Sequence, residues 1–168
     1  IVHSIEENEC DGNYLEYICD AYLFYKAQRY DIKGKQYLKT LNKYYISDLG
    51  LRNAKLNYRQ VEITHSLENV VYLELLRRGF VVDIGKNRLK EIDFVARNDG
   101  NLYYIQVAYT ISEPEKSEQE ISSFYGLDDG YKKIVITMDD DPFVNLKNGY
   151  KKINIFDFLL NDRALEEA

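Results

Sequence analysis

The chain has 168 residues, of which 45% are hydrophobic and 30% are charged, with nine glycines and two prolines. This composition is typical of a folded globular protein and excludes collagen-like, low-complexity and disordered chains. No apolar run approaches the roughly 20 residues that span a bilayer, and no signal-peptide pattern opens the sequence. Two cysteines are too few for a disulfide scaffold, so we expect a cytoplasmic protein without a membrane partner. Two histidines exclude a multi-histidine zinc site, which leaves carboxylates as the ligands for any metal.

The net charge of −6 hides a strong segregation of charge along the chain. Residues 26–59 contain nine lysines and arginines against two aspartates. Because nucleic acid binds to a local basic patch, the overall acidity does not exclude a DNA partner. The alternative is a solvated hairpin whose lysines keep a sheet edge from aggregating. The candidate nucleic-acid contacts are six side chains of this segment: Lys26, Arg29, Lys33, Lys35, Lys39 and Lys43.

The first part of the chain predicts a short helix followed by a hairpin. Apolar residues recur at helical spacing between Leu15 and Tyr22. A near-alternating aromatic strand follows at Tyr22–Tyr30, then a basic turn at 31–35 and a second strand at Leu38–Ser47. A helix and a hairpin with a basic tip form the second half of a winged-helix domain. We therefore expect residues 1–59 to be that half, with the first two helices upstream of Ile1.

The remaining residues, 60–168, predict a mixed sheet flanked by helices. A helix capped by Thr64 or Ser66 runs to Arg78, and Gly79 follows it as the residue that ends a helix. The later elements are strands at 80–84, 91–97 and 102–109, a helix at 114–124, strands at 133–138 and 152–155, and a last helix from Phe156. This order predicts the α/β (α+β) class.

Acidic side chains occur on the buried stripe of this helix and along one face of the strand at 91–97. Glu68 lies on the buried stripe of the helix, where a carboxylate needs a partner. In the strand at 91–97, Ile92 and Phe94 take one face by alternation, and Glu91 and Asp93 take the other.

The turn at 98–101 fixes which residues lie opposite these acids. A four-residue loop pairs Arg97 with Leu102, and this register sets Asp93 opposite Gln106 and Glu91 opposite Ala108. A three-residue loop would separate Asp93 from Gln106. We expect Glu68 to approach this pair from the helix.

These segments resemble a known family. A Glu on the first helix, an Asp on the second strand and (Glu/Gln)-x-Lys on the third is the layout of PD-(D/E)XK nuclease-like domains. The stretches SLENVVYLELLRRG (66–79), KEIDFV (90–95) and YIQV (104–107) are similar to the C-terminal module of prokaryotic AAA+ family ATPases. The segments 22–30, 31–35 and 43–53 are similar to the winged-helix part of the same proteins. The resemblance implies that residues 1–59 belong to the winged-helix domain and residues 60–168 form the nuclease-like domain. It also implies that an N-terminal ATPase domain of the same protein is their partner.

Two departures from the family limit what the resemblance implies. No Gly-x-x-x-x-Gly-Lys-(Ser/Thr) is present, so ATP belongs only to the missing ATPase domain and not to this segment. The nuclease lysine is also absent, because Ala108 stands two residues after Gln106. Glu68 and Asp93 still supply two carboxylates for a weak Mg²⁺ site. A lysine from elsewhere could replace the missing one, and the candidates are Lys86, Lys90 and Lys116.

The sequence therefore predicts a degenerate nuclease-like site at Glu68, Asp93, Gln106 and Ala108. The leading hypothesis is a non-catalytic module that binds double-stranded DNA or regulates its parent ATP-binding protein, because a fold does not imply an activity. The alternatives are a metal-dependent nuclease with a relocated lysine and a protein-interaction module.

Overall fold

The computed structural model describes residues 9–39, 42–56, 63–140 and 145–168, with side chains from Tyr14 onward. The helices are α1 (Glu9–Asp20), α2 (Leu49–Lys55), α3 (Ile63–Arg77), α4 (Pro114–Ile121), α5 (Ile155–Leu160) and α6 (Ala164–Glu167), with 3-10 turns η1 (Ser122–Phe124) and η2 (Lys147–Gly149). The strands are β1 (Phe24–Ala27), β2 (Arg29–Asp31), β3 (Gln36–Tyr37), β4 (Lys43–Ile46), β5 (Val81–Asn87), β6 (Lys90–Asn98), β7 (Asn101–Val107), β8 (Lys132–Thr137) and β9 (Lys151–Asn154). In these residues, no helix is both long and apolar enough to cross a bilayer.

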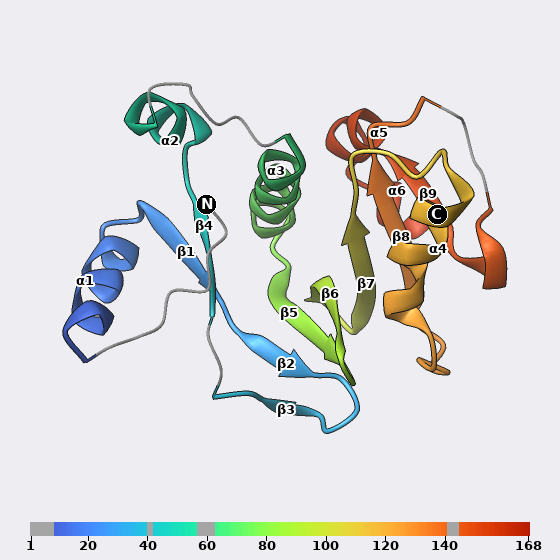
Figure 1. Ribbon diagram of the computed structural model, residues 1–168, viewed down its shortest axis with the longest axis horizontal. Coiled ribbons are helices and arrows are strands. Elements are labelled where there is room, and N and C mark those ends of the chain that lie inside the picture. Colours follow the sequence, from blue (N-terminus) through green and yellow to red (C-terminus); the bar gives the residue numbers. More distant parts are fainter. Residues whose placement is uncertain (1–8, 40–41, 57–62, 141–144) are drawn as a thin grey trace.

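A seven-stranded mixed sheet forms the centre of the molecule, in the order β3-β2-β5-β6-β7-β8-β9 (Figure 1). The β5-β6-β7 part is antiparallel, whereas β2 runs parallel to β5, and β7, β8 and β9 run parallel to one another. The predicted mixed sheet flanked by helices is confirmed. The elements predicted for 60–168 each appear within a few residues of their expected bounds.

Each face of this sheet carries its own apolar core. Side chains of α3, α5 and α6 pack on one face, around residues such as Phe94, Ile105 and Phe158. Side chains of α4, η1 and the turn after β2 pack on the other face, around Ile92 and Phe124. The sheet is therefore the middle layer of three. Polar side chains on either of its faces can be buried beneath the helices.

The predicted hairpin of the N-terminal segment exists, but it is split between two sheets. Near its tip, β2 pairs with β3, and β2 also joins β5 of the central sheet. Near its base, β1 pairs with β4 in a separate two-stranded ribbon, with Ala27 opposite Lys43. The arm predicted as one strand at Tyr22–Tyr30 is therefore interrupted at Gln28. The division at 59/60 stays a prediction, although the tip of the first segment completes the sheet of the second.

Helix α3 ends as predicted and begins earlier than predicted. Gly79 has φ +80°, and the amides of Gly79 and Phe80 donate to the carbonyls of Leu76 and Leu75. These two hydrogen bonds satisfy orphan carbonyls in a Schellman motif. Thr64 and Ser66 both lie inside the helix, which already includes Ile63, so the prediction that one of them provides the N-cap is wrong: their backbone is helical, whereas an N-cap residue lies just outside the helix.

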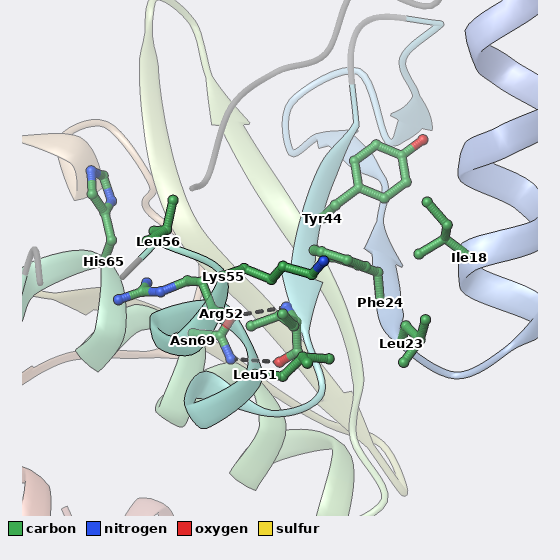
Figure 2. Close-up of a pocket in the computed structure, with 11 residues that line it drawn as sticks. Ile18, Leu23, Phe24, Tyr44, Leu51, Arg52, Lys55, Leu56, His65 and Asn69 are labelled. Carbon is green, nitrogen blue, oxygen red and sulfur yellow. Dashed lines mark hydrogen bonds between the residues drawn. The ribbon is translucent and has the colours of Figure 1, made fainter. Parts of the chain in front are cut away.

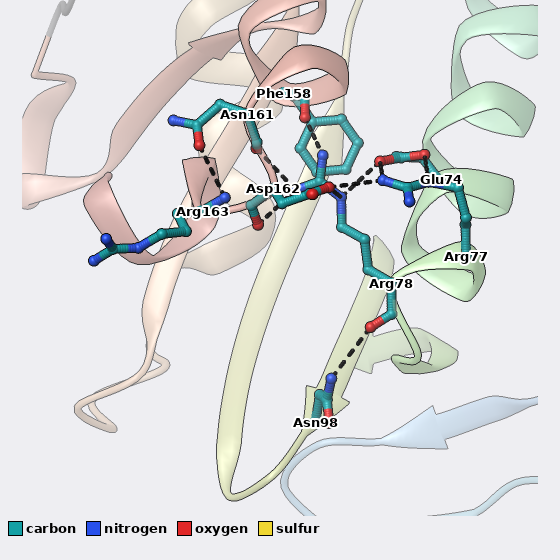
Figure 3. A network of polar contacts seen from close by, with 8 residues as sticks. All are labelled: Glu74, Arg77, Arg78, Asn98, Phe158, Asn161, Asp162 and Arg163. Carbon is teal, nitrogen blue, oxygen red and sulfur yellow. Dashed lines mark hydrogen bonds and ion pairs between the residues drawn. The ribbon is translucent and has the colours of Figure 1, made fainter.

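Arg78, just after α3, ties that helix to α5. Its guanidinium bonds the Glu74 carboxylate at 2.7 Å and lies 4.4 Å from the centre of the Phe158 ring (Figure 3). It also donates to the carbonyls of Phe158 and Asn161 at the end of α5. An arginine at these carbonyls caps the helix and holds α5 beside α3.

A bulge in β6 overturns the simple alternation expected there. Asp83 pairs with Val95 and Gly85 with Ile92, so that Ile84 alone faces both Asp93 and Phe94. Ile92 packs in the core on one face of the sheet, and Phe94 packs in the core on the other. The prediction that Ile92 and Phe94 share a face is therefore wrong, because an extra residue in one strand reverses the alternation beyond it.

We predict that Gly85→Ala destabilises the protein by about 1–3 kcal/mol through overpacking. A Cβ at this position would lie 2.9 Å from Cβ of Ile92 and from Cγ2 of Val95. The free energy of unfolding in urea measures the effect. Gly130→Ala is the matched control, because its Cβ would meet nothing within 4 Å. Equal stability of the two variants would contradict the close packing described at Gly85.

Candidate functional site

A buried lysine lies at the centre of the predicted acidic site. The Lys43 ammonium on β4 is 3.0 Å from Oε1 of Glu68 on α3 and 2.7 Å from Oε1 of Glu91 on β6. Lys43 is only 9% exposed. Three elements that are far apart in the sequence thus bring two carboxylates to this buried ammonium, because a buried charge needs a partner.

Two further side chains complete the contacts of these carboxylates. The Tyr45 hydroxyl donates to Oε1 of Glu68 at 2.6 Å, and the guanidinium of Arg29 on β2 forms an ion pair with Glu91. Lys43 and Tyr45 alternate with Tyr44 along β4, so both point to the same side. The Tyr45 ring stacks on Tyr72 of α3 with centroids 4.0 Å apart, which fixes this part of β4 against the helix.

Asp93 and Gln106 lie side by side, as the predicted hairpin register requires. Arg97 pairs with Leu102, and the register continues to Phe94 and Ile105. One step further, the Asp93 amide donates to Oε1 of Gln106 at 3.4 Å, and the Val107 amide donates to Oδ2 of Asp93 at 2.8 Å. The β6–β7 backbone pairing ends at Phe94 and Ile105, and these side-chain contacts continue the same register beyond it.

Residues of α4 and η1 close the other side of Gln106. The Ser123 hydroxyl donates to Oε1 of Gln106 at 3.3 Å, and the side chain of Gln106 hydrogen-bonds to Glu120. Sequence reasoning missed Glu120 because nothing in the predicted helix at 114–124 distinguished it from the other acids. It adds another carboxylate whose charge reaches Asp93.

Burial and charge set the protonation of the cluster. Burial raises the pKa of Asp93 well above its usual value, and the charge of Glu68 raises it further, against the opposing effects of Lys43 and the Val107 amide. Burial by itself would also raise the pKa of Glu91, but the Lys43 and Arg29 charges outweigh it and lower that pKa. For Lys43, burial lowers the pKa, and Glu68, Asp93 and Glu91 together raise it above the usual value. The cluster therefore contains a protonated lysine and an aspartate that retains its proton more readily than usual.

The three lysines considered as replacements for the missing one make their described contacts elsewhere. Lys86 donates to the Leu89 carbonyl, Lys90 donates to Ser122, and Lys116 pairs with Glu113. Ala108 is buried, and its amide donates to the Ile136 carbonyl. Lys43 contacts the acids instead, and its position two residues before Tyr45, on the same side of the strand, was the signal that could have indicated an inward-pointing lysine.

The residues that a nuclease-like site would use do not fit a divalent cation as they stand. Oε1 of Glu68 already accepts two hydrogen bonds, and Oε1 of Gln106 faces the Asp93 amide and the Ser123 hydroxyl. In the part of the chain that the structure describes, no group of three His, Cys, Asp or Glu side chains is arranged to hold a metal. Donors of the protein itself saturate these oxygens.

The six predicted nucleic-acid contacts divide into two groups. Arg29 and Lys43 are committed to the acidic cluster, with side chains 17% and 11% exposed. Lys26, Lys33, Lys35 and Lys39 are exposed. Lys33 and Lys35 lie in the hairpin turn, where the Asp31 carboxylate accepts the amides of Lys33 and Gly34 and holds the turn in place.

An apolar pocket lies on the other side of β4 from the acidic cluster. It has a volume of about 330 Å³ and lies among α1, β1, β4, α2 and α3 (Figure 2). Tyr44 and Ile46 of β4 line it, whereas Lys43 and Tyr45 of the same strand contact the cluster. Asn69 lines it too, next to Glu68, and bonds both the amide and the carbonyl of Ile46. Strand β4 therefore separates the apolar pocket on one side from the acidic cluster on the other.

The chain is similar to two uncharacterised microbial proteins. An uncharacterised protein of Haemophilus influenzae is 46% identical over 130 residues, which cover 77% of this chain and 32% of that protein. An uncharacterised protein of Methanocaldococcus jannaschii is 35% identical over 159 residues, which cover 89% of this chain and 33% of that protein. The chain thus spans about a third of the length of these relatives. No family model and no solved structure matches it.

We predict that Asp93→Asn stabilises the protein at neutral pH and has less effect near pH 4. An acid whose pKa is raised by folding contributes stability below its unfolded pKa, and that contribution is lost as the pH rises through the folded pKa. The asparagine removes this pH dependence while its carbonyl can still accept the Val107 amide. Urea unfolding at both pH values measures the difference.

Asp99→Asn makes the same chemical change in the exposed turn between β6 and β7 and is the control. A stability profile of Asp93→Asn that runs parallel to that of the wild type would show that folding does not raise the pKa of Asp93.

Proposed function

We propose that this chain is a non-catalytic, nuclease-like module that binds double-stranded DNA or regulates the longer AAA+ type ATP-binding protein to which it belongs. The observation that carries the proposal is the Lys43 ammonium between Glu68 and Glu91. A nuclease of this type needs carboxylates that bind a metal and a lysine that faces the attacking water. Here the acids and the lysine are paired with one another.

The position of the missing lysine supports the same proposal. Ala108 is buried in an apolar core and offers no charge. Gln106 is neutral, and its carbonyl oxygen is used by donors of β6 and η1. The loss of one electrostatic contact at a transition state commonly costs on the order of 10²–10³ in rate.

The hairpin tip supplies the surface for DNA in this proposal. Lys33 and Lys35 project from a turn that Asp31 holds in one conformation, and Lys39 follows on the same arm. Lysines at such a tip contact phosphates and do not read bases, so the binding would be insensitive to sequence. The matched segments make up only 32% and 33% of the two relatives, which leaves room in those proteins for an ATP-binding domain elsewhere.

A metal-dependent nuclease with a relocated lysine is the second candidate. One observation favours it: Lys43 brings to Glu68 and Glu91 the ammonium that Ala108 does not provide. The two candidates differ in whether Lys43 neutralises the acids or assists a reaction, and a cleavage assay separates them.

We predict that Lys33→Glu together with Lys35→Glu weakens binding of duplex DNA regardless of sequence. Each lost phosphate contact also flattens the slope of log affinity against log salt by about 0.9. Filter binding across a salt series measures both effects. Lys116→Glu with Lys147→Glu makes the same change in net charge at exposed lysines outside the hairpin. If both double variants bind equally, the hairpin tip is not the DNA surface.

We also predict that the wild-type chain does not cleave DNA or RNA in the presence of Mg²⁺ or Mn²⁺. The physical reason is that Lys43 pairs with the acids and that Ala108 has no charge. Gel assays with plasmid, linear duplex and single-stranded substrates test this, beside Asp93→Ala. Divalent-dependent cleavage that disappears both in Asp93→Ala and in Lys43→Met would establish the second candidate instead.

A further inference from the structure

A second basic turn lies beside the hairpin tip. It is the two-residue turn between β5 and β6, where Arg88 and Leu89 are exposed and Lys86 and Lys90 flank them. We propose that this turn is a second contact surface for double-stranded DNA, next to the turn at 31–35, and that Leu89 is its apolar wedge in the minor groove. This inference rests on the proposed function, because it extends the DNA surface from the hairpin tip to the central sheet.

The fold places the two basic turns at the same end of the sheet. Strand β2 runs parallel to β5 with Asp31 opposite Lys86, and the Ile32 amide donates to the Lys86 carbonyl at 3.1 Å (Figure 1). One turn leads to β3 and the other to β6, on opposite sides of the β2–β5 pair. The centres of the turns are therefore about two strand spacings, about 10 Å, apart. Segments 31–35 and 86–90 contain one acid, Asp31, and five cations: Lys33, Lys35, Lys86, Arg88 and Lys90.

This spacing and charge suit a DNA duplex. B-DNA carries one negative charge per about 1.7 Å of its axis, so a length of 10 Å carries about six phosphate charges. The neighbouring acids are paired with other cations, because Glu91 bonds Lys43 and Arg29, and Glu118 of α4 bonds Lys147. The cations of the two turns therefore remain available for phosphates.

The new turn does not serve to protect a sheet edge. Lysines on an edge strand keep sheets from pairing with one another, but β5 and β6 are interior strands between β2 and β7. Arg88 forms no ion pair with any residue that the structure describes. Leu89 is 94% exposed, more than any other large apolar side chain in the described ranges. A free cation and a protruding leucine thus lie together where the sheet itself needs neither.

The conformation of the turn is fixed, and its backbone is strained at the cation. The side-chain amide of Asn87 donates to the carbonyls of Ser123 and Tyr125 at 2.8 and 3.0 Å, which ties the turn to η1. Arg88 has φ +56°, in the left-handed region that hairpin turns usually fill with glycine. Lys35 in the other turn has φ +50°. Both turns therefore present a cation where glycine fits the backbone better, and strain of this kind is typical of binding sites.

The exposed leucine favours DNA over a lipid surface. Proteins that bind the minor groove often insert a leucine or another apolar wedge between base steps. A lipid surface also attracts an apolar side chain between cations, but even a whole myristoyl chain gives only marginal membrane binding. Leu89 has far fewer carbon atoms than such a chain, so it suits a groove better than a bilayer.

The experiment is filter binding of duplex DNA across a salt series. We expect Arg88→Gly to bind about tenfold more weakly at 0.1 M salt and to flatten the slope of log affinity against log salt by about 0.9. We expect Leu89→Ser to bind about tenfold more weakly with an unchanged slope, because an apolar contact releases no counterions. Arg163→Gly and Leu160→Ser make the same changes at exposed positions of the C-terminal helices, away from both turns (Figure 1), and are expected to bind as the wild type.

Thermal unfolding followed by circular dichroism separates a lost contact from a lost fold. Arg88→Gly is expected to unfold at the temperature of the wild type or above it, because glycine adopts a positive φ without steric cost. Weaker DNA binding at undiminished stability is a result that a purely structural role of Arg88 would not give. Arg88→Glu reverses the charge and keeps a side chain at this position, and we expect it to bind DNA more weakly than Arg88→Gly.

The outcomes also separate this inference from the proposed function. If both Arg88 variants or Leu89→Ser bind DNA as the wild type does, while Lys33→Glu with Lys35→Glu weakens binding, the inference is overturned and the proposed function stands. A wild-type chain that does not bind duplex DNA overturns the DNA-binding function, and the inference with it. Vesicles of phosphatidylcholine and phosphatidylserine test the lipid alternative. Vesicle binding that Leu89→Ser abolishes, with DNA binding unchanged, assigns the turn to a lipid surface and overturns the inference.

Discussion

The ion pairs of Lys43 are the interaction on which the rest of the structure depends. They join β4, α3 and β6, which belong to a ribbon, a helical layer and the central sheet. Removing one partner of a buried ion pair commonly costs about 3–5 kcal/mol, because an uncompensated charge remains. The N-terminal ribbon therefore cannot leave α3 without stranding Glu68. The contacts that hold the layers together are therefore the same contacts that determine what chemistry the acids can perform.

The bulge in β6 is the second constraint, and it acts through geometry. A regular strand would place Glu91 and Asp93 on the same face, with Ile92 and Phe94 on the other. Instead, Ile84 faces two residues of β6, and the core residues on either side of Asp93 point to opposite faces. Asp93 thus sits where the ladder opens, close enough to sense both Glu68 beside α3 and Glu120 on α4. Bulges commonly re-aim a side chain at a functional site, and this one lies within the acidic cluster.

The split hairpin links the charged site to the rest of the surface. Its tip extends the central sheet through β2, its base forms the ribbon that carries Lys43, and its turn presents Lys33 and Lys35. Strand β4 faces the acidic cluster on one side and an apolar pocket on the other. A segment whose turn presents exposed lysines is therefore also a structural part of the acidic cluster.

The sequence by itself determined the elements of residues 60–168 to within a few residues, the sheet class and part of the site. Local signals sufficed where the physical cause is local: helical periodicity and Gly79 for α3, and the turn at 98–101 for the register that places Asp93 beside Gln106. Only the tertiary structure decided that Lys43 and Arg29 belong to the acids and not to the basic surface, because ion pairing between residues 25 to 62 positions apart leaves no local pattern. The bulge was equally hidden, since an extra residue in β6 is defined by the pairing with β5 and not by the residues of β6 alone.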